Sequence, residues 1–251
     1  MAPATLAVVF LVVPLLGLAT AVPWTDLGGH LADPDLASAL WISVLTSTVS
    51  AFVCLVLGLP LAWVLARVEL PGRKLLRALI AVPLVMPPVV AGVALRAALG
   101  RSGIVGRPLE QATGWSLPYT TTGVVVAHVF VALPFVVLAI EGALRSADPG
   151  YDDAAATLGA TRWVTFRRVT LPLALPGIAA GVVLGWARSL GEFGATITFN
   201  GSYPGRTQTM PTLIYIERQS DPAGAAVLSM VMLVLSLAIL LALRDRWLAA
   251  P

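Results

Sequence analysis

Six long stretches without any charged residue constrain the fold of this 251-residue chain more than any other feature. Asp, Glu, Lys and Arg make up only 12% of the sequence, about half of their share in an average soluble domain. A helix needs about 20 mainly apolar residues to cross a bilayer, and each stretch is close to that length or longer. We therefore expect an all-α integral membrane protein with six transmembrane helices, forming a single domain over residues 1–251. The charge-free stretches are residues 1–25, 36–66, 78–95, 111–140, 169–187 and 222–243.

The first stretch has a second interpretation as a secretory signal peptide. The small residues Ala19 and Ala21 precede Val22-Pro23 in the manner of a cleavage site. A signal peptide carries positive charge before its apolar stretch, whereas nothing before Asp26 is charged. We therefore expect a first transmembrane helix, and place the six spans at about 5–23, 38–66, 76–97, 121–144, 172–199 and 223–243.

Lysine and arginine are unequally divided between alternate loops. Ten of them lie in the loops 67–77 and 145–171 and in the C-terminal tail, against five in the loops on the opposite side. Because cytoplasmic loops carry the excess of Lys and Arg, we expect both termini in the cytoplasm. The net charge of +3 follows from these basic loops, so membrane lipid is an expected partner and nucleic acid is not.

The sequence lacks the residues with which a transporter would hydrolyse ATP itself. A phosphate-binding loop requires Gly-Lys-Ser or Gly-Lys-Thr, and the single lysine, Lys74, follows Arg73. An ion-coupled carrier would place several ionisable groups inside its spans, whereas only Arg188 and Glu192, with Glu141 near the end of a span, come close. The energy source is therefore expected to be a partner protein.

Enzymatic and metal chemistry are not expected either. The chain contains no nucleophile with an adjacent base and no H-E-x-x-H motif, so no catalytic residue is assigned. Cys54, His30 and His128 lie far apart in the sequence without a ligand cluster. No metal site is expected.

The loop at 146–171 carries signals for two short helices. Asp148-Pro149 has the form of an N-cap followed by proline, and Gly159 that of a left-handed C-terminal cap, which together predict a helix over about 149–158. Thr161 can cap a second helix that runs towards Val169. Leu171-Pro172 then opens the fifth span.

The function of the first short helix stays open on spacing alone. Its alanines would let a groove on another protein come close to the helix backbone, and Asp153 would present a negative charge at the edge of the helix. The alternative is a solvated helix in which the alanines only reflect helix propensity.

The spacing of this loop resembles the EAA loop of ABC-importer permeases, E-A-A-x3-G-x9-I-x-L-P, with Asp in place of Glu and Val in place of Ile. In that family the loop forms a coupling helix that docks into a cleft of the cytoplasmic ATPase and transmits closure of the ATP-bound dimer. The resemblance implies an ATPase-coupling role for six residues, although the shorter carboxylate of Asp153 leaves its partner open. They are Asp153, Ala154, Ala155, Gly159, Leu171 and Pro172.

Four further segments resemble molybdate permeases of the ABC class. Sulfate permeases share the Gly191-Glu192-Phe193-Gly194 core, whereas the continuation over 195–199 and the segment 205–209 favour molybdate or the nearly isosteric tungstate. The segments are residues 83–92, 132–135, 188–197 and 205–211.

The resemblance implies the type I ABC importer permease fold and an ATP-driven importer for molybdate or tungstate, located in the inner membrane of a prokaryotic cell. The implied partners are a second permease copy, as a homodimer, two cytoplasmic ABC ATPase subunits and an extracytoplasmic oxyanion-binding protein. ATP and Mg²⁺ would be bound by the ATPase, so no cofactor is expected in this chain. The alternatives are a sulfate or other small-solute permease and, from a different class, a passive channel or membrane scaffold, which would leave the ordered inner loop without a task.

Several residues are candidates for the translocation pathway or gate. Pro87 and Pro88 interrupt the third span, either as a static bend or as a hinge. Arg188 and Glu192 lie four residues apart and can pair across one helical turn, either to neutralise each other or to form a gate. Thr196 and Thr198 are candidate polar lining for an oxyanion, although a threonine in a helix often bonds its own backbone.

Glycines recur on one face of the fifth span. Gly177, Gly181 and Gly185 form two overlapping G-x-x-x-G steps, which allow close approach of another helix in lipid. We expect them to serve helix packing.

Overall fold

The computed structural model describes residues 1–248, and these residues are helical without any β-strand. The long helices are α1 (Ala2–Ala21), α3 (Pro34–Arg67), α4 (Arg73–Val85), α5 (Pro88–Leu99), α7 (Thr121–Ser146), α10 (Leu171–Leu190), α12 (Met210–Ser220) and α13 (Pro222–Leu248). The short elements are η1 (Trp24–Asp26), α2 (Leu27–Leu31), α6 (Gly106–Thr113), α8 (Pro149–Thr157), α9 (Arg162–Thr165), the π-helical turn η2 (Phe166–Thr170) and α11 (Gly194–Asn200). Within these residues five helices are long and apolar enough to span a membrane, and the bent pair α4–α5 raises the number to six.

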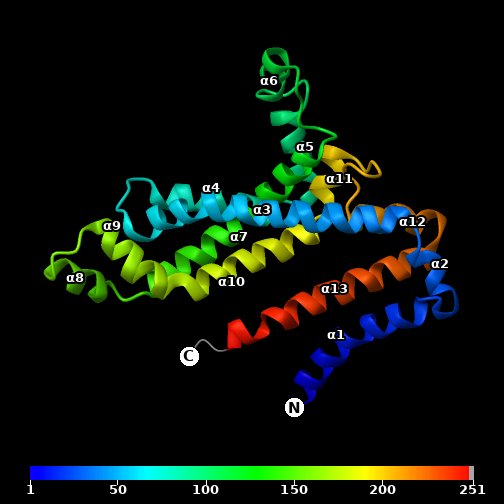
Figure 1. The fold of residues 1–251 in the computed structure, drawn as a ribbon, viewed down its shortest axis with the longest axis horizontal. Helices are drawn as coiled ribbons and strands as arrows, with labels where there is room; N and C mark the ends of the chain where they lie inside the picture. Colours follow the sequence, from blue (N-terminus) through cyan, green and yellow to red (C-terminus); the bar gives the residue numbers. More distant parts are fainter. Residues whose placement is uncertain (249–251) are drawn as a thin grey trace.

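The helices α3, α7 and α10 form the centre of the molecule and pack along one another (Figure 1). Their contact is an apolar cluster that runs from Cys54 to Leu65 on α3 and includes Ile140 and Leu144 of α7 and Ile178 of α10. Small residues such as Ala62 and Ala132 in this cluster are fully buried, which is typical of helix packing in lipid. The bundle is therefore held together by close packing.

The third expected span, 76–97, is broken in the structure. α4 ends at Val85 and α5 begins at Pro88, with an angle of 115° between the two helices. Proline disfavours helical dihedrals in the residue before it, and Met86 is accordingly extended (ψ 127°), as is Pro87 (ψ 136°). The two prolines thus produce a sharp break, and α5 and α6 project away from the bundle (Figure 1).

The fifth expected span, 172–199, is also interrupted. α10 ends at Leu190, Gly191–Phe193 are not helical, and α11 begins at Gly194. The two half-helices α5 and α11 pack against each other: a Cβ atom on Gly194 would lie 2.6 Å from Pro88 Cβ, and one on Gly92 2.6 Å from Thr198 Cβ. Glycine at these positions allows the contact, because any larger side chain would force the elements apart.

α1 and α13 lie together beside the bundle (Figure 1). In the described chain no residue of α1 is buried, and its contact with α13 is made near its C-terminal end by Leu18 and Val22 against Ala226 and Val227. The first residue of α1 and the last turn of α13 point to the end of the molecule that carries α8 and α9 (Figure 1). The start of α1 and the last described turn of α13 are therefore on the side of the 146–171 loop, and the cytoplasmic location of that side stays a prediction.

Candidate coupling loop and translocation pathway

The helix predicted over about 149–158 is observed as α8. The Asp148 carboxylate accepts a hydrogen bond from the Gly150 amide (2.9 Å), so Asp148 is the N-cap as expected. Gly159 follows the helix with φ +79°, the left-handed conformation that the sequence predicts, and nothing lies within 4 Å of the place where its Cβ would be. The loop is therefore an ordered helix with an open surface at its C-terminal end.

The second predicted helix begins where expected but changes form. The Thr161 hydroxyl accepts a hydrogen bond from the Val164 amide (3.4 Å) and caps α9. α9 makes one turn and then widens into η2, which continues into α10 at Leu171 without a break. α9, η2 and α10 therefore form one continuous helical stretch over Arg162–Leu190.

The residues expected to meet an ATPase lie mainly on the outer face of the loop. Asp153, Ala154 and Gly159 are exposed, as is Pro172, and Ala155 and Leu171 are half-buried. The side chain of Asp153 is exposed and makes no ion pair or hydrogen bond with other residues in the range 1–248, so its carboxylate faces outward.

Asp152, which the sequence analysis did not select, fastens α8 to the membrane helices. Thr170 Oγ1 of η2 donates to Asp152 Oδ1 (2.8 Å), and Arg67 Nη1 at the end of α3 lies 3.4 Å from Asp152 Oδ2. Arg67 also donates to the carbonyl of Ala147 (3.3 Å). Neighbouring residues on a helix are about 100° apart, so the two adjacent aspartates point in different directions, but the sequence does not indicate which of them faces the bundle.

Glu141 forms a second link at the same end of the bundle. Its side chain is buried, and its two oxygens lie 3.1 Å from Arg77 Nη2 of α4 and 2.9 Å from Arg145 of α7. Arg145 also contacts the carbonyl of Leu65 on α3. One buried carboxylate thus joins α4 and α7 directly and approaches α3 through Arg145.

The structure brings Arg188 and Glu192 together, as their spacing predicts. Arg188 Nη1 and Glu192 Oε2 are 2.6 Å apart, and Glu192 Oε1 accepts from the Ala195 amide (2.8 Å). Glu192 therefore neutralises Arg188 and also caps the backbone at the start of α11. This double role holds the interruption between α10 and α11 in one geometry.

The two candidate threonines have different surroundings. Thr198 donates to the carbonyl of Gly194 in its own helix (2.7 Å), so its hydroxyl is already satisfied. The buried Thr196 hydroxyl has no partner among the described residues, and the same holds for the side chains of His128 and Asn200. Asn200 lies at the start of α7, because its Oδ1 is 2.2 Å from the place where a Cβ on Gly123 would be. We call Thr196, His128 and the hydrogen-bonded Ser50 and Ser189 (2.9 Å) the buried polar region: Ser189 follows Arg188 directly, and α11 packs against α7.

His128 was not assigned to this region from the sequence. It is buried on α7, and neither of its ring nitrogens has a hydrogen-bond partner among the described residues. Its isolated position in a charge-free stretch was a usable signal, because a polar ring in a span is costly unless it faces the protein interior.

The three glycines of the fifth span face α7. A Cβ on Gly177 would lie 2.4 Å from Ala143 Cβ, one on Gly181 2.7 Å from Ala139 Cβ, and one on Gly185 2.4 Å from Val136 Cγ2. Each distance is too short for a real side chain, so α10 and α7 approach as closely as they do only because these residues are glycine.

The family described as "Binding-protein-dependent transport system inner membrane component" matches residues 55–250. The chain belongs to this family. The permease is accordingly a multi-pass inner-membrane protein and a transport subunit, and ATP hydrolysis is carried out by a separate subunit.

Curated relatives of the permease fall into two groups by name. The molybdenum transport system permease protein ModB of Mycobacterium tuberculosis is 46% identical over 244 residues, which cover 97% of this chain and 92% of the relative. The sulfate transport system permease protein CysT of Escherichia coli is 36% identical over 211 residues, covering 83% of this chain and 76% of the relative. The molybdenum relative is thus the more similar of the two in both identity and extent.

Solved structures of a bacterial ABC transporter that imports alginate have the same fold as the permease. One matches with a TM-score of 0.81 at 20% identity, covering 99% of this chain and 94% of the other. Another, with a TM-score of 0.77, is in complex with a periplasmic protein bound to an alginate pentasaccharide. The comparison establishes an ABC importer permease fold.

Proposed function

We propose that this permease forms the translocation pathway of an ATP-driven importer for molybdate or tungstate. The observation that carries the proposal is the 46% identity to a molybdenum permease over nearly the whole chain, against 36% to a sulfate permease. The ordered loop at 146–171 adds support, because a passive channel has no need for a capped helix fastened to both α3 and η2.

The proposed assembly contains two copies of the permease, two cytoplasmic ABC ATPase subunits and an extracytoplasmic binding protein for the oxyanion. The ATPase subunits bind ATP and Mg²⁺, and this chain holds no cofactor. The alginate transporter with its bound periplasmic protein supports the delivery of substrate from the side opposite to α8.

Coupling follows from the geometry of the loop. When ATP binding draws the ATPase subunits together, the outer face of α8 with Asp153, Ala154 and Gly159 moves with them. Asp152 transfers this movement to η2 through Thr170 and to α3 through Arg67. Because η2 continues into α10, the displacement reaches the buried polar region near Arg188.

The polar region suits the passage of a doubly charged oxyanion. Thr196 and His128 offer hydrogen-bond donors that have no partner among residues 1–248, whereas the charge of Arg188 is already neutralised by Glu192. Neutral donors bind an anion weakly enough to release it, while a free buried cation would retain it.

The test is uptake of labelled molybdate into vesicles that contain the permease with its ATPase and binding protein. Gly159→Asp should abolish ATP-dependent uptake, because the side chain must adopt a strained φ of +79° and protrudes where the ATPase docks. The matched control is Gly114→Asp, since Gly114 ends α6 with φ +70° and also has nothing within 4 Å of its Cβ position.

Competing anions identify the substrate in the same assay. Unlabelled tungstate should reduce molybdate uptake, and sulfate at equal concentration should not. Competition by sulfate would change the assignment of the substrate and leave the proposal of an ATP-driven importer intact. Undiminished uptake in Gly159→Asp without ATP would overturn the importer and leave a channel.

A further inference from the structure

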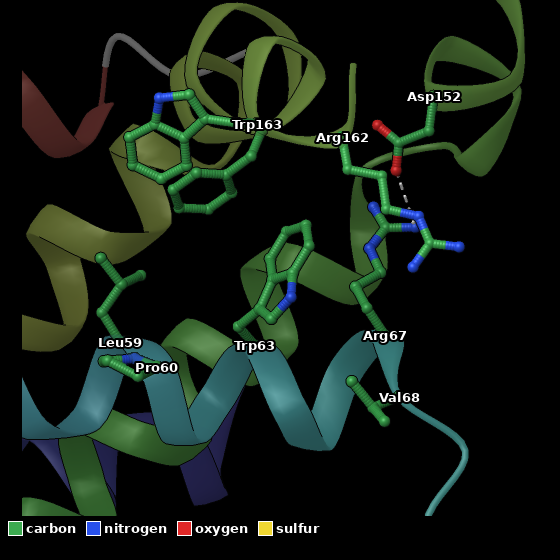
Figure 2. A pocket seen from close by; sticks show the side chains of 9 residues that line it. Leu59, Pro60, Trp63, Arg67, Val68, Asp152, Arg162 and Trp163 are labelled. Atoms are coloured by element: carbon green, nitrogen blue, oxygen red, sulfur yellow. Dashed lines mark ion pairs between the residues drawn. The ribbon is translucent and has the colours of Figure 1, made fainter. Parts of the chain in front are cut away.

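A cavity of about 700 Å³ lies between the last two turns of α3 and the loop of α8, α9 and η2. Figure 2 shows its lining side chains, which come from both segments. Its volume is within the range of small-molecule sites, about 300–1,000 Å³. The permease function assigns no ligand to it. The cavity is lined by Leu59, Pro60, Trp63, Arg67, Val68, Asp152, Arg162, Trp163 and Phe166.

The two sides of the cavity differ in chemistry. Leu59, Pro60 and the aromatic rings form one side, and the charged ends of Arg67, Arg162 and Asp152 lie towards the other (Figure 2). The rings are packed together: the centroids of Trp63 and Phe166 are 4.7 Å apart and those of Trp163 and Phe166 5.7 Å apart. A ligand that fills this cavity needs a polar end and an apolar end.

The polar side has an excess of positive charge. Two guanidinium groups face one carboxylate, and that carboxylate is already paired with Arg67. The side chain of Arg162 is exposed and forms no ion pair or hydrogen bond with the residues that the structure describes. The polar end is therefore complementary to an anion.

The position of the cavity along α3 matches the membrane interface. Leu59 and Arg67 are eight residues apart, which corresponds to about 12 Å along the helix axis. Arg67 ends the helix, and Trp63 lies one turn deeper. Tryptophan is enriched at the level of lipid headgroups, so the charged side faces the headgroup layer and the side with Leu59 and Pro60 faces the acyl chains.

We propose that this cavity binds one anionic phospholipid, whose phosphate is held by Arg162 and Arg67 and whose first acyl carbons lie against Trp63 and Leu59. The proposal depends on the cytoplasmic orientation of this end, where anionic lipid attracts basic residues. It does not depend on the transported substrate. The outer face of α8 does not line the cavity, so lipid and ATPase can bind together.

Bound lipid can be counted by native mass spectrometry of the purified, delipidated complex of permease, ATPase and binding protein. The probes are dioleoyl phosphatidylglycerol and dioleoyl phosphatidylcholine, added at equal concentration. The wild type should retain phosphatidylglycerol in preference to phosphatidylcholine. Arg162→Gln should reduce the binding of phosphatidylglycerol about fivefold, the effect of one basic residue near the surface, whereas Arg162→Lys should keep most of it.

Arg168→Gln is the matched control, because Arg168 is an exposed arginine in the same loop that does not line the cavity. It should retain the wild-type preference, and the subunit ratio in the same spectra shows that each complex is intact. Equal losses in Arg162→Gln and Arg168→Gln would overturn the site in favour of general surface attraction. Absence of any preference in the wild-type complex, or displacement of the lipid by millimolar molybdate, would also overturn it.

Discussion

The ion pairs at the two ends of α10 differ in what they join. At the N-terminal end, Asp152 and Arg67 belong to separate elements, and their side chains are 27% and 18% exposed. At the C-terminal end, Arg188 and Glu192 lie one turn apart in the same segment, and their side chains are 28% and 1% exposed. Water therefore reaches both members of the first pair but only the arginine of the second.

This difference suits the first pair to transmitting movement of α8 and the second pair to stabilising the fold. An ion pair near water contributes about 0–1 kcal/mol. The pair of Asp152 and Arg67 therefore links α8 to α3 without strongly stabilising one position of the loop over another. Removal of one partner from a buried pair costs about 3–5 kcal/mol, so Arg188 and Glu192 fix the local geometry where α10 ends. The pair at the N-terminal end of α10 is suited to movement and the pair at its C-terminal end to rigidity.

Glu192→Gln tests the pair at the C-terminal end of α10 and should cause the largest loss of stability. It leaves Arg188 without its counter-charge inside the span, with an expected loss of about 3 kcal/mol. Thermal unfolding of the purified transporter measures this loss. The double variant Arg188→Gln with Glu192→Gln should recover part of the stability, and a double variant less stable than either single one would contradict mutual neutralisation.

Gly181→Leu tests the part of α10 that connects the two ends. Its Cβ alone would lie 2.7 Å from Ala139 Cβ, so overpacking should cost about 1–3 kcal/mol. Gly142→Leu on α7 is the control, because nothing lies within 4 Å of that Cβ position. Equal unfolding temperatures for the two variants would show that α10 and α7 do not need this contact.

The same contrast explains what the sequence could predict. Asp148, Gly159 and Thr161 act on their own helix ends, so the sequence predicts their roles without reference to the rest of the fold. Arg188 and Glu192 are also local, being one turn apart.

Other features depend on how the helices are arranged in three dimensions. The prolines predict a break, but the angle of 115° depends on the packing of α5 against α11. The choice between Asp152 and Asp153 is set by the rotation of α8 relative to the bundle. The link from Glu141 to Arg77 joins two spans, and neither interaction leaves a local pattern.

The loss of stability in Glu141→Gln should lie between the losses in Glu192→Gln and Asp152→Asn. The carboxylate is buried, but its partners Arg77 and Arg145 are 49% and 42% exposed and can be solvated when the charge is removed. We expect a loss of about 1–2 kcal/mol, below that of Glu192→Gln because of this screening. Unfolding temperatures should show it, with the exposed Glu69→Gln as a control that changes stability by less than about 0.5 kcal/mol.

Asp152→Asn should change stability least, by less than about 1 kcal/mol, and should still disturb transport. The amide keeps one acceptor for Thr170 but loses the charge that attracts Arg67, so α8 can follow the ATPase without moving α3. The complex should assemble and hydrolyse ATP, and the molybdate imported per ATP should fall.

The neighbouring Asp153→Asn is the matched comparison, because its carboxylate faces outward and is expected to meet the ATPase. It should weaken copurification of the ATPase and lower hydrolysis and uptake together. The two variants would then show that Asp153 serves docking of the ATPase and that Asp152 transmits its movement to α3. If Asp152→Asn instead lost the ATPase while Asp153→Asn kept it, the assignment of the two faces of α8 would be reversed.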